Sequence, residues 1–416
     1  MTASRMISIT KQLHRHLWQH LPYHWRRSAL FLLSSFLAPR PAAKAAPQPP
    51  IYVAGALSTA SGLGQSARLC HDALKANGEF PVFGVDLTSA LMQPEDAAFA
   101  FADGWNRRGP GTLILHVNAP FVPLALWRLG QRFVSDKHII GVWHWELPRT
   151  PADWRHGAPF VHEIWVSSRF AADAVQPIAA GRPVRVVPLP VALQGPVPVA
   201  STRPPGRPFT VLTVFNAASS IARKNPLAAI AAFRLAFGDD PSARLIVKAA
   251  NASVFPPGFA MIENAVRAAN NIVLISETMS DSEIDKLYRD SDVVLSLHRS
   301  EGFGLILAEA MIRGLPVVAT DWSGNVDFVT AQTGIPVPYR LIPAEDPQGT
   351  YQHPELNWAD ADVTAAADAL RRLRHDPELA RRLGETAAAF VAQAFSAQSY
   401  SDTVRRQLRA DLGSPN

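Results

Sequence analysis

The sequence of 416 residues contains a single cysteine, Cys70. One thiol excludes an intrachain disulfide, so the fold depends on its core, and such a chain suits a reducing compartment. Near the N-terminus the apolar stretch 29–38 is only about half as long as a membrane-spanning helix requires. Hydrophobic residues nevertheless make up 48% of the chain. That fraction supports a sizeable core, and the length fits two domains of about 150–200 residues each.

Acidic residues are absent from residues 1–50. The seven basic residues of this segment are Arg5, Lys11, Arg15, Arg26, Arg27, Arg40 and Lys44. Their positive charges exceed the +5 of the whole chain, so residues 51–416 together carry a net charge of −2. The folded body is therefore not a basic protein. A general electrostatic surface for DNA or RNA is excluded, and we expect no nucleic-acid partner.

Residues 1–50 also hold Trp18, Trp25 and four histidines between His14 and His24. A basic, aromatic segment of this kind is typical of an arm that lies on an anionic membrane surface. A disordered tail and an export signal are the alternatives, although the basic region ahead of the apolar stretch is long for a signal. The prediction is a cytoplasmic protein that lies peripherally on the inner membrane face.

From residue 51 onward, short apolar runs alternate with helical periodicity. Buried strands are predicted at 51–57, 80–87, 112–118, 138–145, 163–168, 209–215, 244–250, 271–276, 292–298 and 316–321. Helices are expected between them, so the chain has an α/β pattern with parallel sheets covered on both faces.

A proline-rich stretch divides this pattern in two. Residues 188–208 contain seven prolines and no helical period, which predicts a linker. The expected domains are 51–187 on the acceptor side and 209–395 on the donor side, and we expect residues 396–416 to form a helix that packs back on the first domain. Two doubly wound units leave a cleft at the carboxyl ends of their strands, where ligands bind by default.

Glu301 and Glu309 lie on either side of a Gly-Phe-Gly in the stretch SEGFGLILAEAM, residues 300–311. The glycines turn the chain from the predicted strand 292–298 into the helix that carries Glu309. Free N–H groups at a helix start form an anion site, and glycines let a phosphate approach closely. Carboxylates on either side can accept hydrogen bonds from sugar hydroxyls. The arrangement suits a sugar-phosphate-ribose ligand, but a lone pair with this spacing also occurs without any joint role.

The wider context is more specific. Residues 296–329 closely resemble the donor-binding segment of retaining glycosyltransferase family 4, whose signature is two glutamates separated by seven residues around a Gly-Phe-Gly. The resemblance extends over segments 141–175, 223–238, 336–351 and 357–362, and together these cover most of residues 51–400. It implies a GT-B fold, in which two Rossmann-like, doubly wound domains face each other across a cleft.

Family roles carry over by position. The resemblance implies that Glu309 accepts hydrogen bonds from the ribose hydroxyls and that Glu301 contacts the transferred sugar. The residues implied to approach the diphosphate, mainly through backbone N–H groups, are Gly302, Phe303, Gly304 and Leu305.

Cations are also implied beside the leaving diphosphate. Lys224 should neutralise it with Arg223 alongside, and Lys248 is a further candidate for the same cluster. Such cations stabilise the charge that develops on the diphosphate, as a metal ion does elsewhere. We therefore expect no metal and no cofactor, with the nucleotide sugar as a substrate. In isolation, an Arg-Lys pair before a helix is usually a solvated face, so this assignment depends on the resemblance.

The glycine-rich stretch GLGQSA, residues 62–67, allows two interpretations. It matches the Gly-x-Gly-x-x-Ala fingerprint of dinucleotide-binding proteins, and Asp86 lies about 20 residues further on, where a ribose-binding acid is expected. However, residues 58–61 separate Gly62 from the preceding strand. A longer loop of this kind is common in family 4, where it approaches the donor phosphates, so Gly62 and Gly64 are implied to bind the donor. An NAD-dependent oxidoreductase remains a distant alternative.

One departure from the family concerns the reacting centre. Many members carry His-x-His-x-Pro with the second histidine near the reacting sugar, whereas this chain has His116-Val117-Asn118-Ala119-Pro120. Asn118 cannot act as a base at neutral pH but can hold a sugar hydroxyl. The expected mechanism is a front-face displacement with retention, in which the leaving oxygen takes the proton from the acceptor. Catalysis then depends on positioning and charge stabilisation.

The resemblance implies transfer of a hexose from a nucleotide sugar to a glycan or lipid-linked acceptor in polysaccharide biosynthesis. Among the hexoses it favours mannose. Trp143, Trp145, Trp154 and Trp165 are aromatic residues that either stack on an acceptor sugar or belong to the core. A sugar-nucleotide epimerase of the same fold and a non-catalytic sugar-nucleotide-binding protein remain as alternatives.

Overall fold

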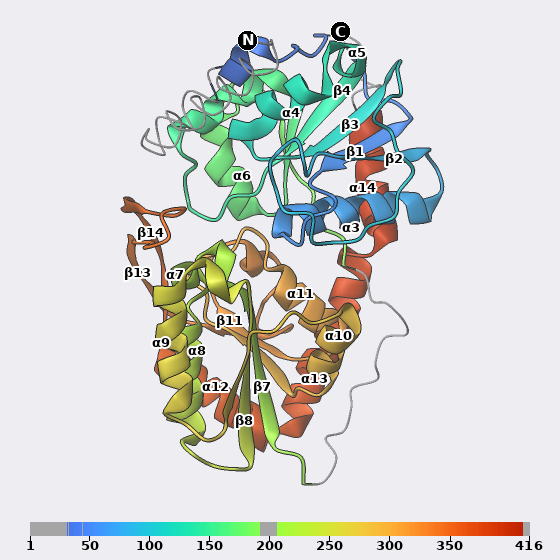
Figure 1. Ribbon diagram of the computed structural model, residues 1–416. Coiled ribbons are helices and arrows are strands. Elements are labelled where there is room, and N and C mark those ends of the chain that lie inside the picture. The colour runs from blue at the N-terminus through green and yellow to red at the C-terminus, as the bar shows by residue number, and fades with distance from the viewer. Residues whose placement is uncertain (1–30, 32, 44, 192–205, 411–416) are drawn as a thin grey trace, which may run out of the picture.

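The computed structural model describes residues 31, 33–43, 45–191 and 206–410. Within this part of the chain there are two six-stranded parallel sheets and one two-stranded antiparallel sheet (Figure 1). The predicted fold class, two doubly wound α/β domains, is confirmed. Most of the predicted N-terminal arm (1–30) and most of the predicted linker (192–205) lie outside the described residues. No described helix is long and apolar enough to cross a bilayer.

The first sheet has the strand order β2-β1-β3-β4-β5-β6. Its strands are β1 (Ile51–Gly55), β2 (Val82–Asp86), β3 (Gly111–His116), β4 (Lys137–Val142), β5 (Glu163–Val166) and β6 (Val184–Val186). The accompanying helices are α3 (Gly62–Asn77), α4 (Val122–Leu129), α5 (Gln131–Val134) and α6 (Arg169–Val175). Four central strands are buried along their whole length because both faces are covered. The edge strand β6 was not predicted, since three half-buried residues give no hydrophobic run.

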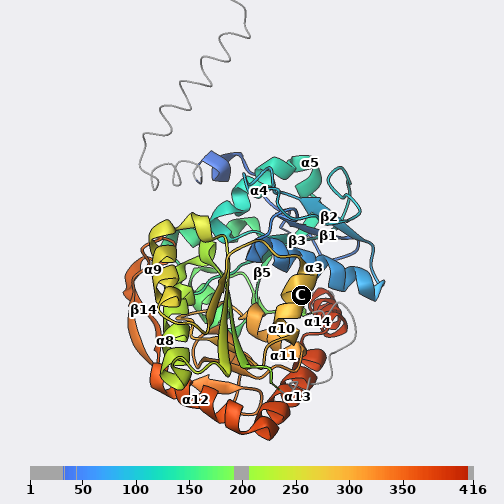
Figure 2. The same cartoon turned by 60° about the horizontal axis from the view of Figure 1, so that its bottom comes forward.

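The second sheet has the order β12-β11-β10-β7-β8-β9. Its strands are β7 (Phe209–Asn216), β8 (Ala243–Ala250), β9 (Ile272–Ile275), β10 (Val293–Ser296), β11 (Val317–Thr320) and β12 (Ile335–Val337). Its helices are α7 (Ile221–Lys224), α8 (Pro226–Phe237), α9 (Pro256–Arg267), α10 (Asp281–Arg289), α11 (Leu305–Ile312), α12 (Val363–His375) and α13 (Pro377–Ala394). Figure 2 shows α8, α9 and α12 on one side of the strands and α10, α11 and α13 on the other, and a separate buried cluster fills each side.

The last helix, α14 (Ala397–Ala410), crosses back to the first domain and packs on α3 (Figure 1). Tyr400, Val404 and Leu408 belong to the same buried cluster as Cys70 and Leu74 of α3. Burial raises the pKa of the Cys70 thiol to about 12, so this cysteine behaves as a small apolar core residue.

A hairpin of the second half of the chain also joins the first domain. It consists of β13 (Tyr339–Ala344) and β14 (His353–Ala361). Its residues Ala344, Tyr351, Leu356 and Trp358 are buried in the same cluster as the β3 and β4 side chains. Neither strand was predicted, because prolines and charged residues interrupt both runs. The hairpin therefore makes the two domains share one hydrophobic core.

We expect Gly384→Ala to destabilise the fold. A Cβ at this position of α13 would lie 1.9 Å from the backbone oxygen of Gly314, so α13 must move away. Overpacking of this kind costs about 2 kcal/mol, enough to lower the thermal midpoint of a chain of this length by about 2 °C. Thermal unfolding measures the shift, and Ala389→Ser on the exposed face of the same helix is the control. An unchanged midpoint for Gly384→Ala would contradict the tight contact between the helix and Gly314.

Candidate active site

The Gly-Phe-Gly turn lies between β10 and α11 and is held by backbone contacts. The Gly324 N–H donates to the backbone oxygen of Glu301 at 2.9 Å. A Cβ on Gly324 would lie 2.3 Å from the backbone oxygen of Gly302. Gly304 has φ 96°, a conformation that favours glycine. The Phe303 side chain packs against Phe328 and Phe395, with ring centroids 5.2 Å apart in both pairs. The turn is therefore rigid before any ligand arrives.

The amides of this turn are available to a ligand. Among the described residues, no protein acceptor bonds the N–H groups of Phe303, Gly304 or Leu305. These groups stand at the N-terminus of α11, where the helix dipole favours an anion. The turn thus has the geometry of a phosphate cradle.

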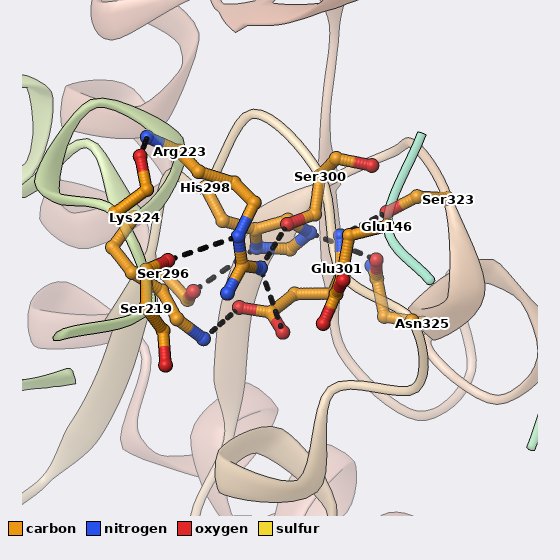
Figure 3. A network of polar contacts seen from close by, with 12 residues as sticks. Glu146, Ser219, Arg223, Lys224, Ser296, His298, Ser300, Glu301, Ser323 and Asn325 are labelled. Carbon is orange, nitrogen blue, oxygen red and sulfur yellow. Dashed lines mark hydrogen bonds and ion pairs between the residues drawn. The ribbon is translucent and has the colours of Figure 1, made fainter. Parts of the chain in front are cut away.

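Glu301 binds two cations from a single short helix, α7 (Figure 3). Its Oε1 pairs with Lys224 Nζ, and its Oε2 lies 3.4 Å from Arg223 Nη1. Arg223 is 2% exposed and also donates to the backbone oxygens of Ser300 (2.7 Å) and Ser219 (3.1 Å). The structure thus brings together Glu301, Arg223 and Lys224, three of the residues predicted for the reacting centre.

These contacts change the protonation equilibria. Burial alone would raise the pKa of Glu301, but Lys224, then Arg223 and His298, outweigh it and lower that pKa to about 2. Burial lowers the pKa of Lys224, although the charge of Glu301 opposes this. Burial likewise disfavours the charged form of Arg223, yet Tyr351, Glu301 and Glu146 together raise its pKa. Glu301 is therefore ionised at neutral pH and lies against two basic side chains.

A second layer of side chains holds Glu301 in place. Its backbone N–H donates to Ser323 Oγ at 2.8 Å. His298, which is fully buried behind it, contacts Asn325 Oδ1 through Nε2 at 2.9 Å. Burial lowers the pKa of His298, so the imidazole is neutral and serves as a hydrogen-bonding support.

Glu309 lies on α11 and is bound from both domains. Its Oε1 accepts a hydrogen bond from Gln65 Nε2 at 3.1 Å, and its Oε2 accepts one from the Tyr288 hydroxyl at 3.2 Å. Burial raises the pKa of Glu309, and the nearby Arg313 opposes this rise. Gln65 belongs to α3, so the glycine-rich segment of the first domain faces the second glutamate of the motif.

The glycine-rich segment forms the first turn of α3. Ser61 caps this helix by accepting a hydrogen bond from the Gly64 N–H at 3.2 Å. A Cβ on Gly64 would lie 2.3 Å from the Thr59 oxygen, which explains the glycine, whereas Gly62 has open space around it. Asp86 is engaged by the loop itself, because its carboxylate accepts hydrogen bonds from Leu57, Ser58 and Thr88. This engagement weakens the dinucleotide interpretation.

Among the described residues, two other predicted residues make no hydrogen bond or ion pair with Glu301. Lys248, on β8, donates to the backbone oxygens of Glu277 (2.8 Å) and Ala249 (3.2 Å), and no contact joins it to the cation pair. Asn118 follows β3, and its Oδ1 accepts a hydrogen bond from the His144 N–H at 2.8 Å. Its amide therefore positions the backbone after β4.

The neighbouring histidine, His116, is buried. Its Nδ1 contacts Ser66 Oγ at 2.9 Å, which leaves the imidazole inside the first domain.

Four residues at the site were not predicted to have a role. Gln65 and Tyr288 bind Glu309, the Tyr351 ring lies beside Arg223, and Glu146 accepts a hydrogen bond from Tyr351. Glu146 was within a stretch interpreted only for its aromatic residues, and Tyr351 lies in the unpredicted hairpin. In WHWEL, residues 143–147, apolar and polar residues alternate, and this alternation was the sequence signal that could have placed Glu146 on the face opposite the tryptophans.

Comparison with known proteins agrees with this geometry. Residues 166–401 match the family described as "Family 4 Glycosyltransferase in conflict systems". The chain belongs to glycosyltransferase family 4. This chain is 30% identical over 137 residues to alpha-D-kanosaminyltransferase of Streptomyces kanamyceticus. That match spans 33% of this chain and 30% of the relative's length.

Solved structures share the fold. Sucrose-phosphate synthase of Thermosynechococcus elongatus matches with a TM-score of 0.63 at 18% identity, covering 87% of this chain and all of that one. HepE of Anabaena, in complex with UDP and glucose, gives 0.62 at 13% identity, covering 86% and 99%. The pneumococcal O-GlcNAc transferase GtfA, in complex with UDP and GlcNAc, gives 0.52 at 18% identity, covering 74% and 58%. The GT-B fold of this family 4 protein is therefore confirmed.

The depressed pKa of Glu301 predicts a pH-dependent contribution to stability. The folded pKa of about 2 lies below the ordinary value of 4.5, so the stabilisation is complete above pH 4.5 and is lost as the pH falls toward 2. We expect the difference in unfolding free energy between wild type and Glu301→Gln to shrink by about 2 kcal/mol between pH 5 and pH 3. Urea unfolding at each pH measures it, with the exposed Glu345→Gln as control. A constant difference would show that Glu301 is not held by the two cations.

Proposed function

We propose that this family 4 protein transfers a hexose from a nucleoside-diphosphate sugar to a hydroxyl group of a glycan or lipid-linked acceptor, with retention of configuration. The observation that carries the proposal is the placement of Arg223 and Lys224 on Glu301, directly beside the unbonded amides of residues 303–305. In this proposal the cations and amides face the diphosphate. Glu309 accepts hydrogen bonds from the ribose in addition to those from Gln65 and Tyr288, and Glu301 contacts the sugar beside its two cations.

The chemistry follows from these charges. As the bond between the anomeric carbon and the diphosphate oxygen breaks, negative charge grows on that oxygen, and the two cations and the turn amides stabilise it. The acceptor oxygen bonds to the same face of the anomeric carbon, and its proton passes to the leaving diphosphate. Asn118 is no base, and the Lys248 ammonium donates to the backbone oxygens of Ala249 and Glu277, so neither is assigned the proton. We propose that the reaction needs no metal ion, because the cation pair supplies the positive charge.

The finer substrate assignment is also a proposal. The residues RKNP at 223–226 and SGNVDF at 323–328 resemble variants found in enzymes of surface polysaccharide assembly, which favours a mannose-type donor. UDP is named in the solved complexes of HepE and GtfA. The ribose and diphosphate contacts proposed here are common to UDP and GDP, so they do not distinguish a UDP-sugar from a GDP-sugar.

Nucleotide binding tests the donor site. We expect one of UDP, GDP and ADP, added without metal and in the presence of EDTA, to stabilise the protein, since a ligand at a hundred times its Kd adds about 2.7 kcal/mol. Glu309→Ala should abolish this thermal shift, whereas Glu301→Ala should mainly lower turnover. Glu263→Ala, on the exposed surface of α9, is the control. Stabilisation by NAD alone would place the nucleotide site at Gly62 and Gly64 and overturn the proposal. Conversion of the nucleotide sugar to another nucleotide sugar without any acceptor would instead identify an epimerase.

We propose as well that the protein lies on an anionic membrane surface. Helical residues 33–37 lie beside α4, because Phe31 packs edge-on to Phe121 at 5.3 Å (Figures 1 and 2). Phe36 is 87% exposed, and Leu33 and Leu37 are exposed beside it. The seven basic residues of the first fifty add electrostatic attraction to anionic lipid.

Vesicle co-sedimentation tests this surface. We expect the full chain to bind vesicles of phosphatidylglycerol and phosphatidylcholine, less so at 0.5 M salt, and Phe36→Ser to weaken binding about tenfold because one large apolar side chain is lost from the lipid contact. Met261→Ser, an equally drastic change on α9, should have no effect. Equal binding by wild type and Phe36→Ser would argue against the proposed surface.

A further inference from the structure

The stretch after β4 presents two polar side chains in one direction. In WHWEL, Trp143, Trp145 and Leu147 are buried in the first domain's core, while His144 and Glu146 between them are partly exposed. Side chains in an extended chain alternate between opposite faces. His144 and Glu146 therefore face away from that core, and His144 Nε2 contacts Ser66 Oγ at 3.1 Å at the start of α3.

Glu146 stands at the reacting centre although it belongs to the first domain. A Cβ built on Gly302 would lie 3.1 Å from the Trp145 oxygen and 3.7 Å from Cγ of Glu146. Glu146 and Glu301 thus flank the same glycine from opposite domains. Figure 3 draws Glu146 with the residues around Glu301, and its charge acts on both Arg223 and Lys224.

One oxygen of Glu146 is clamped and the other is available. Oε2 accepts a hydrogen bond from the Tyr351 hydroxyl at 2.6 Å. Burial and the Glu146 charge raise the pKa of Tyr351, so the hydroxyl stays protonated and keeps donating. The Tyr351 ring lies 5.1 Å from the Arg223 guanidinium, which fixes it in turn. Within the described part of the chain, Oε1 of Glu146 accepts no hydrogen bond.

We propose that Glu146 is an acceptor-binding residue, whose free oxygen accepts a hydrogen bond from the hydroxyl next to the attacking one. The proposal rests on the proposed transferase function and adds the chemical class of the acceptor. A carboxylate at this place attracts hydroxyl donors and repels anions, so the reacting end of the acceptor is a neutral sugar. The bonds that break and form are those already described, and Glu146 takes no proton.

The test compares wild type with Glu146→Gln, which keeps the shape of the side chain and removes its charge. The donor is the nucleoside-diphosphate hexose whose base stabilises the protein, and the acceptor probes are neutral octyl glucoside, galactoside and mannoside, with octyl glucuronide as the charged probe. We expect the variant to bind the nucleoside diphosphate at least as tightly as wild type, because the change removes a negative charge beside the cation pair. Its ratio of transfer to donor hydrolysis should fall at least tenfold for the neutral probe that wild type uses best, through a higher acceptor KM.

The charged probe gives an independent readout. Wild type should prefer the neutral glycoside to the glucuronide, and Glu146→Gln should narrow that preference because the repulsion is gone. Glu345→Gln, an exposed glutamate of the same hairpin as Tyr351, should behave as wild type.

Several results would overturn the inference. If Glu146 acted only by positioning Arg223 through Tyr351, transfer and hydrolysis would fall together and their ratio would stay constant. An unchanged preference between neutral and charged probes, or wild-type transfer to no neutral glycoside, would also reject it. Failure of the wild type to bind any nucleoside diphosphate would instead refute the proposed function itself.

Discussion

A guanidinium that has almost no contact with water must find all its partners inside the protein, and Arg223 imposes this requirement on the site. Its partners come from three separate places in the chain: the carbonyl groups of Ser219 and Ser300, the carboxylate of Glu301 and the ring of Tyr351. Satisfying one buried charge therefore places α7, the turn before α11 and the hairpin next to one another. The cation pair and the phosphate cradle are adjacent as a result.

Contacts around the same turn connect the two domains. The first domain reaches the turn through Ser168, whose Oγ donates to the Gly302 oxygen at 2.6 Å, and through Arg169, which pairs with Asp327 at 2.7 Å. Gln65 adds a contact to Glu309 on the other side. These contacts fall on the motif and on the 323–328 segment beside it, so the residues that join the domains also surround the site.

The hairpin β13–β14 gives this closed arrangement its stability. It belongs to the second half of the chain, yet Tyr351 and Trp358 are buried among side chains of the first domain. Helix α14 does the same at the opposite side by packing on α3. Apolar burial at two separate places resists separation of the domains more than the few polar contacts at the site do. The hydroxyl of Tyr351 then links this apolar contact to Glu146.

Local pattern in the sequence determined the alternation of buried strands and helices, the division into two doubly wound units, and the glycine turn between Glu301 and Glu309, whereas the cation pair was assigned only through the family resemblance. These features are readable because each depends on neighbours along the chain: hydrophobic periodicity, helix starts and glycine turns. Only the tertiary structure decided that Lys248 binds the backbone oxygen of Glu277, that Gln65 faces Glu309, and that Glu146 joins Tyr351 across 205 positions of sequence. Contacts of that kind depend on how packed elements meet, and no local pattern encodes that meeting.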